Sequence, residues 1–310
     1  MHKTIDLAAL GEAMLEFNQT QAGQPQYLQG FGGDTSNAAI AAARAGARAA
    51  YLTRIGDDPF GQALLDLWAA EGVDTRAVAR DPAAHTGIYF VTHGPQGHQF
   101  SYLRAGSAAS RMTPDWLQGA PGEAIRCARI LHLSGISLAI SPQACDTAFA
   151  AMQLAREAGT RVALDSNLRL KLWPLARAQA CIAHAVSLCD LFLPSLDDMV
   201  TLTGLTDPEA IVDWGHARGA AQVVLKLGAE GSLVSDGRRR ERVGGRAVEA
   251  VDATGAGDCF CGNLLARLAA GEDLFAAARY ANAAAALAVQ GWGAVAPLPR
   301  RAAVEAELAR

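Results

Sequence analysis

The chain has 310 residues, 51% of them hydrophobic, which is enough apolar material for a large buried core. Its formal net charge is −4 with acids and bases interspersed, so it lacks the basic face that binding to nucleic acid or to an anionic membrane requires. The one basic run, residues 238–242, follows Ser235-Asp236-Gly237 and is interpreted as a solvated hairpin tip. We therefore expect neither a nucleic-acid nor a membrane partner.

The six cysteines lack CxxC spacing, and a chain of this length can build its core without disulfides. We predict free thiols that are mostly buried. The first ten residues carry Asp6 inside their only apolar stretch, so they lack the uninterrupted segment of a secretory signal. Residues 280–299 are broken by Gln290, Gly291 and Gly293, which favours a buried helix over a membrane span. These features predict a cytoplasmic protein.

Short apolar runs alternate with amphipathic segments along the chain. The runs are predicted strands, at residues 5–10, 50–55, 130–133, 161–164, 191–193 and 222–227. Predicted helices include residues 60–71, 142–158 and 175–187, together with the alanine-rich tracts 38–50 and 276–288. Strands that cross back through helices give this alternation. We therefore predict an α/β fold, a doubly wound and mostly parallel sheet flanked by helices, in a single domain over residues 1–310.

Two segments, residues 14–31 and 87–104, interrupt this alternation. The second has alternating strand patterns at 88–92 and 99–103 on either side of Gly94-Pro95-Gln96-Gly97, which predicts a β-hairpin. Tyr102 and Arg104 are two residues apart and face the same side, and Tyr89 is placed to join them across the ladder. We expect these segments to form a small β-sheet lid over the ligand end of the main sheet. An exposed apolar edge on this lid predicts a homo-oligomer.

A glycine-rich turn near the end of the chain carries the clearest chemical signal. Asp252-Ala253-Thr254-Gly255-Ala256-Gly257-Asp258 opens an apolar helix, and small side chains let a phosphate approach the unpaired N–H groups there. A carboxylate beside an anion-binding site is electrostatically unfavourable unless it has a function there. Asp258 could accept the proton of an attacking hydroxyl. The alternative is that Asp258 only favours the positive end of its helix. Neither a P-loop nor a GxGxxG opening is present.

A second polar cluster, Asp165-Ser-Asn167-Leu-Arg169, directly follows the apolar run Val162-Ala-Leu. This position is the carboxyl end of a predicted strand, where open α/β sheets bind their ligands. The sequence therefore predicts a binding role for this cluster.

Two separate motifs resemble the ribokinase-like, or PfkB, family of carbohydrate kinases. They are the turn Asp252 to Asp258 and the segment Gly32-Gly33-Asp34-Thr35-Ser36-Asn37-Ala38-Ala39. The resemblance implies a ribokinase-like fold, ATP with Mg²⁺, and a monovalent cation such as K⁺. It also implies that Asp258 is the base and that the amides of Gly255, Ala256 and Gly257 hold the transferring phosphoryl group.

Within that family the chain looks most like 2-keto-3-deoxygluconate kinases, through Phe31-Gly-Gly-Asp-Thr, Tyr102-Leu-Arg104 and Leu133-Ser-Gly-Ile-Ser-Leu-Ala. An arginine can bind a sugar carboxylate through paired, charge-assisted hydrogen bonds, whereas a neutral sugar offers no such partner. The resemblance implies phosphorylation of the terminal hydroxyl to give a 6-phosphate. The sugar-acid pocket that it implies, with Asp258, consists of Gly33, Asp34, Asn37, Tyr89, Tyr102, Arg104 and Arg169.

The resemblance also implies a nucleotide side, which includes the turn Lys226-Leu-Gly228-Ala-Glu-Gly231. This side consists, beyond Gly255 to Gly257, of Asn167, Arg169, Ser195, Lys226, Gly228, Gly231 and Asn282. Asn282 either belongs to the adenine wall or satisfies a neighbouring backbone group.

Two departures from the family pattern concern the metal. Ala253 replaces the usual threonine, and Ser195-Leu-Asp-Asp198 stands where many relatives have Asn-x-x-Glu. Asp198 is therefore expected to help hold Mg²⁺ through water.

Two alternatives to the sugar-acid kinase stay open: a fructokinase- or ribokinase-type kinase of a neutral sugar or nucleoside, and a sugar-binding sensor without catalysis.

Overall fold

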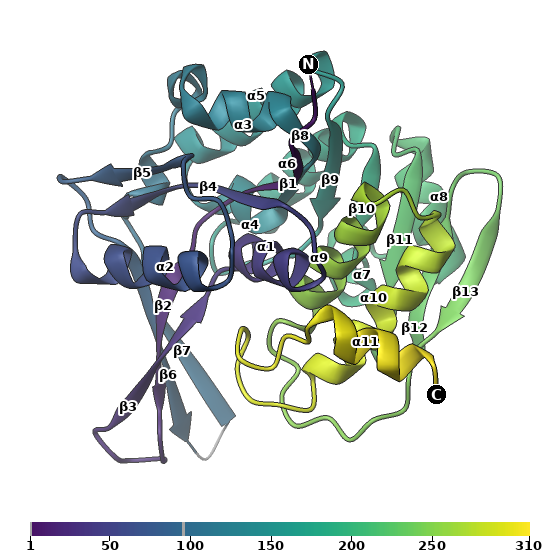
Figure 1. The fold of residues 1–310 in the computed structure, drawn as a ribbon. Coiled ribbons are helices and arrows are strands. Elements are labelled where there is room, and N and C mark those ends of the chain that lie inside the picture. Colours follow the sequence, from purple (N-terminus) through teal and green to yellow (C-terminus); the bar gives the residue numbers. More distant parts are fainter. Residues whose placement is uncertain (1, 95–96) are drawn as a thin grey trace.

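Two β-sheets form the frame of the computed structural model, which describes residues 2–94 and 97–310. The larger has nine strands in the order β13-β12-β11-β10-β9-β8-β1-β4-β5, and the smaller has four in the order β3-β2-β6-β7 (Figure 1). The larger sheet contains β1 (Ile5–Leu10), β4 (Ala49–Gly56), β5 (Val78–Asp81), β8 (Ala128–Ser134), β9 (Arg161–Asp165), β10 (Leu191–Leu193), β11 (Gln222–Lys226), β12 (Gly231–Ser235) and β13 (Arg240–Gly244).

In the larger sheet, every neighbouring pair between β5 at one edge and β11 is parallel, and only the pairs β11–β12 and β12–β13 are antiparallel. All six predicted strands are present, so the predicted mostly parallel sheet is confirmed. The chain order reverses at β1, which lies between β4 and β8. Such a reversal opens a crevice at the carboxyl ends of the strands, which is the usual ligand position in this class of fold.

Helices cover both faces of the large sheet, with a separate apolar core on each face. Successive residues of β1 point to opposite faces, so Leu7 and Ala9 belong to one core and Ala8 and Leu10 to the other. The first core is completed by α1 (Asp34–Arg44), α2 (Pro59–Ala70), α9 (Ala256–Ala269), α10 (Leu274–Ala288) and α11 (Arg301–Leu308). The second is completed by α3 (Ala120–Cys127), α4 (Gly135–Ala139), α5 (Pro142–Glu157), α6 (Leu175–Leu188), α7 (Leu196–Thr203) and α8 (Pro208–Ala217).

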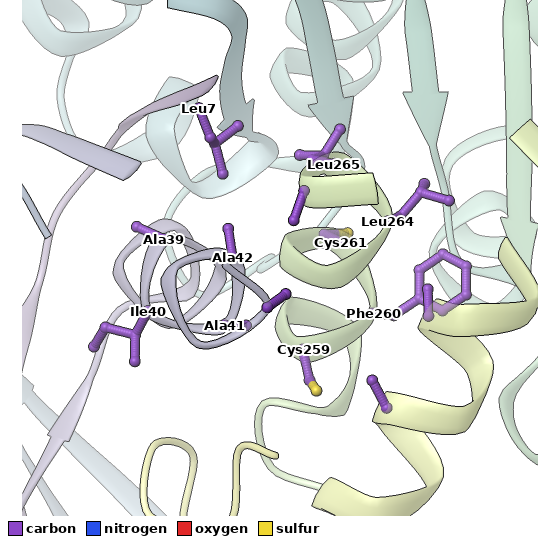
Figure 2. Close-up of a cluster of buried hydrophobic side chains, with 14 of the residues drawn as sticks. Leu7, Ala39, Ile40, Ala41, Ala42, Cys259, Phe260, Cys261, Leu264 and Leu265 are labelled. Carbon is purple, nitrogen blue, oxygen red and sulfur yellow. The ribbon is translucent and has the colours of Figure 1, made fainter. Parts of the chain in front are cut away.

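Small residues let α1 and α9 lie side by side (Figure 2). A Cβ on Gly262 would lie 2.2 Å from the carbonyl oxygen of Ala38 and 2.7 Å from Cβ of Ala41. Only glycine fits such an approach, and the alanines of α1 keep the facing surface flat. This contact fixes α9, which carries Asp258, against α1.

The prediction of a single helix over the alanine-rich tract 38–50 was wrong. Helix α1 ends at Arg44, and Gly46 adopts a positive φ of 97° that reverses the chain. Ala49 already belongs to β4, because alanine is small enough for a tightly covered central strand. The other alanine-rich tract, 276–288, lies within α10 as predicted.

The small sheet is the predicted lid, made of β2 (Met14–Gln19), β3 (Tyr27–Gly32), β6 (Gly87–Gly94) and β7 (Gly97–Leu103) (Figure 1). The hairpin of β6 and β7 is confirmed, although Pro95 and Gln96 of its predicted turn lie outside the described residues. Tyr89 pairs directly with Tyr102 in the ladder, with ring centroids 5.7 Å apart. Shorter 3₁₀ segments occur at Ala109–Arg111, Pro114–Gln118 and Gly228–Glu230.

All six cysteines are free thiols and four of them are buried. Residues 235–240 form the predicted hairpin tip between β12 and β13. Across residues 2–94 and 97–310, no helix has both the length and the apolar character needed to cross a bilayer.

Candidate active site

Asp258 lies in the first turn of α9, directly after the glycine turn. Gly255 is the N-cap residue with φ 76°, and a Cβ there would lie 3.1 Å from Cα, Cβ and O of Ala294, so glycine is required for both its conformation and its packing. Within the described residues, the N–H groups of Gly255 and Gly257 donate no hydrogen bond, whereas Ala256 N–H donates to Ala253 O at 3.2 Å. Free donors and the positive end of a helix therefore meet beside Asp258.

Asn37 of α1 reaches across to Asp258 and donates from its amide to Oδ2 at 2.8 Å. The pKa of Asp258 is raised to about 7, mainly by burial and also by the nearby charge of Asp34, while the hydrogen bond from Asn37 opposes the shift. A carboxylate with a pKa near neutrality is matched to taking a proton from a hydroxyl. The two family motifs, far apart in sequence, thus meet at one carboxylate.

Asp34 begins α1 and accepts a hydrogen bond from the Asn167 amide at 3.1 Å. Asn167 follows β9 and has φ 25°, a left-handed conformation that is strained for a residue other than glycine. Gly33 precedes Asp34 with φ 113°, and a Cβ there would lie 2.6 Å from the Glu12 carbonyl. The backbone is therefore held in unusual conformations where α1 meets the end of β9.

Lys226 and Asp165 form a buried ion pair beneath the glycine turn, with Nζ and Oδ1 2.8 Å apart. Nζ also lies 3.6 Å from Sγ of Cys261 and 3.6 Å from where a Cβ of Gly257 would be. Burial opposes the charge on Lys226, but Asp165 and Cys261 outweigh it and raise the pKa of the lysine above its ordinary value. Lys226 is thus a fixed positive charge close to the proposed phosphate position.

Arg104 follows the last lid strand and is largely buried, with its guanidinium in an ion pair with Glu12. Glu12, which follows β1, also accepts a hydrogen bond from the Ser107 hydroxyl. On the neighbouring lid strands, the Tyr89 hydroxyl donates to Glu16 at 2.6 Å. The buried carboxylates of Glu12 and Glu16 therefore already bind Arg104 and Tyr89, two of the predicted sugar-pocket residues.

Tyr102 and Arg169 differ from these two residues because both are exposed. Tyr102 is 41% accessible, and its ring lies tilted beside that of Tyr89 on the lid. Arg169 donates to its own neighbour, Leu168 O, at 2.8 Å, and in the part of the chain that the structure describes it has no carboxylate within ion-pair distance. Arg169 is therefore the predicted pocket cation that is available to a new anion.

Ser195 and Asp198 are occupied by local structure at the start of α7. The Ser195 hydroxyl caps the helix by accepting from Asp198 N–H at 3.3 Å. Oδ2 of Asp198 accepts from the Ser166 hydroxyl at 2.7 Å and from Leu168 N–H at 3.2 Å. Among the described residues no group of three or more acidic, histidine or cysteine side chains could enclose a metal.

The predicted nucleotide turn lies between β11 and β12, with φ 62° at Gly228 and 95° at Gly231. A Cβ on Gly231 would lie 2.2 Å from Val243 O, so the turn packs directly on β13. Asn282 of α10 donates from its amide to Val243 O at 3.0 Å and to Gly244 O at 3.4 Å. Its side chain therefore satisfies backbone groups next to the turn, which was one of the two interpretations of this residue.

Reasoning from the sequence missed Glu12, Glu16 and the pairing of Asp165 with Lys226. Glu12 comes two residues after a buried strand, the same position at a strand's carboxyl end that singled out the cluster 165–169. Applying that rule to every strand would have found it. Glu16 has no comparable signal, because its importance depends on the tyrosine that faces it across the sheet.

Comparison with curated proteins finds two kinds of kinase at similar distance. The chain is 36% identical over 309 residues to a 2-dehydro-3-deoxygluconokinase of Thermoproteus tenax, covering 96% of this chain and 93% of that protein. It is 33% identical over 319 residues to a probable fructokinase-4 of Arabidopsis thaliana, covering 97% and 96%.

Solved structures agree on the ribokinase-like fold. A PfkB protein from Polaromonas sp. JS666 superposes with a TM-score of 0.89 at 32% identity, over 98% of this chain and 100% of that one. An Escherichia coli protein assigned as a ribokinase II, in complex with ATP and Mg²⁺, gives 0.89 at 25% identity over the full length of both chains. The model of the pfkB family of carbohydrate kinases matches residues 4–301. The chain therefore belongs to the pfkB family, and it is a sugar kinase.

Proposed function

We propose that the protein transfers the γ-phosphoryl group of ATP to the terminal hydroxyl of 2-keto-3-deoxygluconate, or of a close sugar acid, to give the 6-phosphate. The observation that carries the proposal is the meeting of Asp258, held by Asn37, with the N–H groups of Gly255 and Gly257, which donate no hydrogen bond within the described residues. The similarity to a 2-dehydro-3-deoxygluconokinase supports the choice of acid.

Each residue of the site is assigned one role in the proposed reaction. Asp258 accepts the proton of the attacking hydroxyl, and the glycine-turn amides stabilise charge on the phosphoryl oxygens as they change partners. Lys226 contributes a buried positive charge on the same side. We assign Tyr89 and Tyr102 of the lid to covering the sugar, a role that would orient its hydroxyl and exclude water.

Mg²⁺ neutralises phosphate charge when it is bound with ATP, and it needs few direct protein ligands because it retains several waters. Asp198 fits such an indirect role, since Oδ2 is already fixed by two hydrogen bonds next to the site. A monovalent cation such as K⁺ remains a prediction from the family resemblance.

Arg169 is proposed to bind the sugar carboxylate, with Arg104 supporting the same end of the pocket. Arg169 is exposed at the carboxyl end of β9, where its guanidinium can bind a planar carboxylate through two hydrogen bonds. Arg104 has Glu12 as an existing partner, so its charge is already balanced. The balanced charge of Arg104 is the observation that favours the second candidate, a fructokinase-type enzyme for a neutral sugar.

Replacing Arg169 with alanine separates these two candidates. We expect kcat/KM for 2-keto-3-deoxygluconate to fall by about 10- to 100-fold, because a charge-assisted pair is lost, while kcat/KM for fructose stays unchanged. Arg177→Ala is the matched control, since Arg177 is an exposed arginine at the start of α6. Equal losses on both sugars, or no loss on the acid, would contradict the assignment of Arg169.

We also propose that two subunits associate through the lid. Leu28 and Leu103, on the edge strands β3 and β7, are 67% and 52% exposed. Exposed apolar edges favour pairing with a second copy. Light scattering should give a smaller mass for Leu28→Lys than for the wild type, and an unchanged mass would argue against the lid as the interface.

A further inference from the structure

Arg44, the last residue of α1, holds two distant segments with one largely buried guanidinium. Nε and Nη2 donate to the two carboxylate oxygens of Glu71 at 2.9 and 2.6 Å. Nη1 points the other way and donates to the carbonyls of Val295 at 3.1 Å and Leu298 at 2.6 Å, with Ala296 O at 3.4 Å. A planar guanidinium suits this task because its donors leave in fixed, divergent directions.

The segment that Arg44 holds continues into residues that support the glycine turn. Gly293 N–H donates to Oδ2 of Asp252 at 2.9 Å, and Ala294 is the residue against which Gly255 packs. Asp252 and Val251 also donate from their N–H groups to Val289 O, at 3.1 and 2.8 Å. The turn beside Asp258 therefore rests on residues 289–298, and Arg44 fixes the far end of that segment.

The opposite end of α1 acts on the same site. Asn37 donates to Asp258. Helix α1 lies beside α9 (Figure 2), and the close approach at Gly262 fixes the two helices together. One rigid helix thus touches the base directly at its start and supports the glycine turn indirectly at its end.

We propose that Arg44 is a positioning residue that sets the glycine-turn amides relative to Asp258, acting through residues 293–298. This inference rests on the proposed role of that turn in holding the transferring phosphoryl group. Donors preorganised for a transition state must be placed closely, since misplacement by about 1 Å can lower a rate by about 100-fold. The bonds of Nη1 go to loop carbonyls alone, so the pair with Glu71 does not account for them.

Arg44→Lys tests the proposal, because lysine keeps the charge beside Glu71 but cannot hold the loop carbonyls and the carboxylate together. We expect kcat to fall by about 10- to 100-fold with little change in KM for the sugar. In Arg44→Ala, millimolar guanidinium ion should restore part of the lost kcat, which a general loss of stability would not allow.

Two variants serve as controls. Glu71→Gln removes the charge of the partner and leaves the carbonyl bonds of Arg44, so kcat should stay near the wild-type value. Arg54→Ala removes another partly buried pair, with Asp81 at the sheet edge, and should affect stability alone. Folded Arg44 variants with wild-type kcat, or a kcat loss matched by Arg54→Ala, would overturn the proposal. An active Asp258→Asn would instead show that the assignment of the site is wrong.

Discussion

Replacing Asp258 with asparagine is expected to lower kcat by about 10²- to 10⁴-fold, because a general base typically contributes that much to the rate. The amide keeps the size of the side chain and its contact with Asn37, so the fold should persist. ADP release measured with ATP and a sugar acid gives kcat, and circular dichroism confirms folding.

A matched control comes from Asp273, another carboxylate at a helix N-terminus. It caps α10 by accepting from Phe275 N–H and Ala276 N–H, and lies on a helix that presents no glycine turn. Asp273→Asn should lower stability but leave kcat intact. If both variants behave alike, Asp258 only complements its helix dipole, and the catalytic assignment is lost.

The same carboxylate predicts the dependence on pH. Its pKa is raised from 3.8 to about 7, so the wild-type rate should rise with pH through about 7, where the base loses its proton. The stability of the folded protein should change with pH in the opposite direction to the rate. Between about pH 4 and 7 the folded protein keeps a proton that the unfolded chain has lost, so stability relative to Asp258→Asn falls as pH rises and levels off above pH 7. Urea titrations of both proteins check this.

Replacing Lys226 with methionine is expected to lower the free energy of unfolding by about 3 to 5 kcal/mol, because Asp165 would be left as an unpaired buried charge. The two side chains are 12% and 4% exposed, so water can do little to compensate. Urea unfolding monitored by fluorescence measures the loss.

The double variant Lys226→Met with Asp165→Asn tests the cause, since removing both charges should recover much of the lost stability. Arg80→Ala breaks a solvated pair with Asp57 and should have a much smaller effect. A loss for Lys226→Met that the double variant does not relieve would show that packing, and not the unpaired charge, is responsible.

The sheet and the glycine turn could be predicted from the sequence because their signals are local. The six predicted strands are short apolar runs, and the turn from Asp252 to Asp258 is a continuous set of small residues ahead of a helix. The hairpin that carries Tyr89 and Tyr102 could be predicted from the alternating pattern of its strand residues and from the turn formers between the strands. The observed pairing of Tyr89 with Tyr102 agrees with the predicted one.

Long-range pairing could not be predicted in the same way. Glu12 and Arg104 are 92 residues apart in number, and nothing in either neighbourhood indicates that the lid brings them into an ion pair. The end of α1 was missed because alanine favours a helix in isolation, whereas at Ala49 burial in a central strand decides. Such outcomes depend on the tertiary structure more than on local preference.

The most direct test of the proposed function is the comparison of kcat/KM for 2-keto-3-deoxygluconate, fructose and ribose in one ATP-coupled assay. Phosphorus NMR of the product identifies which oxygen carries the phosphate. We predict that the sugar acid is preferred by about tenfold or more, as expected for one charge-assisted pair, and that phosphate appears on its terminal oxygen. Equal efficiency on the neutral sugars, or sugar binding without ADP formation, would contradict it.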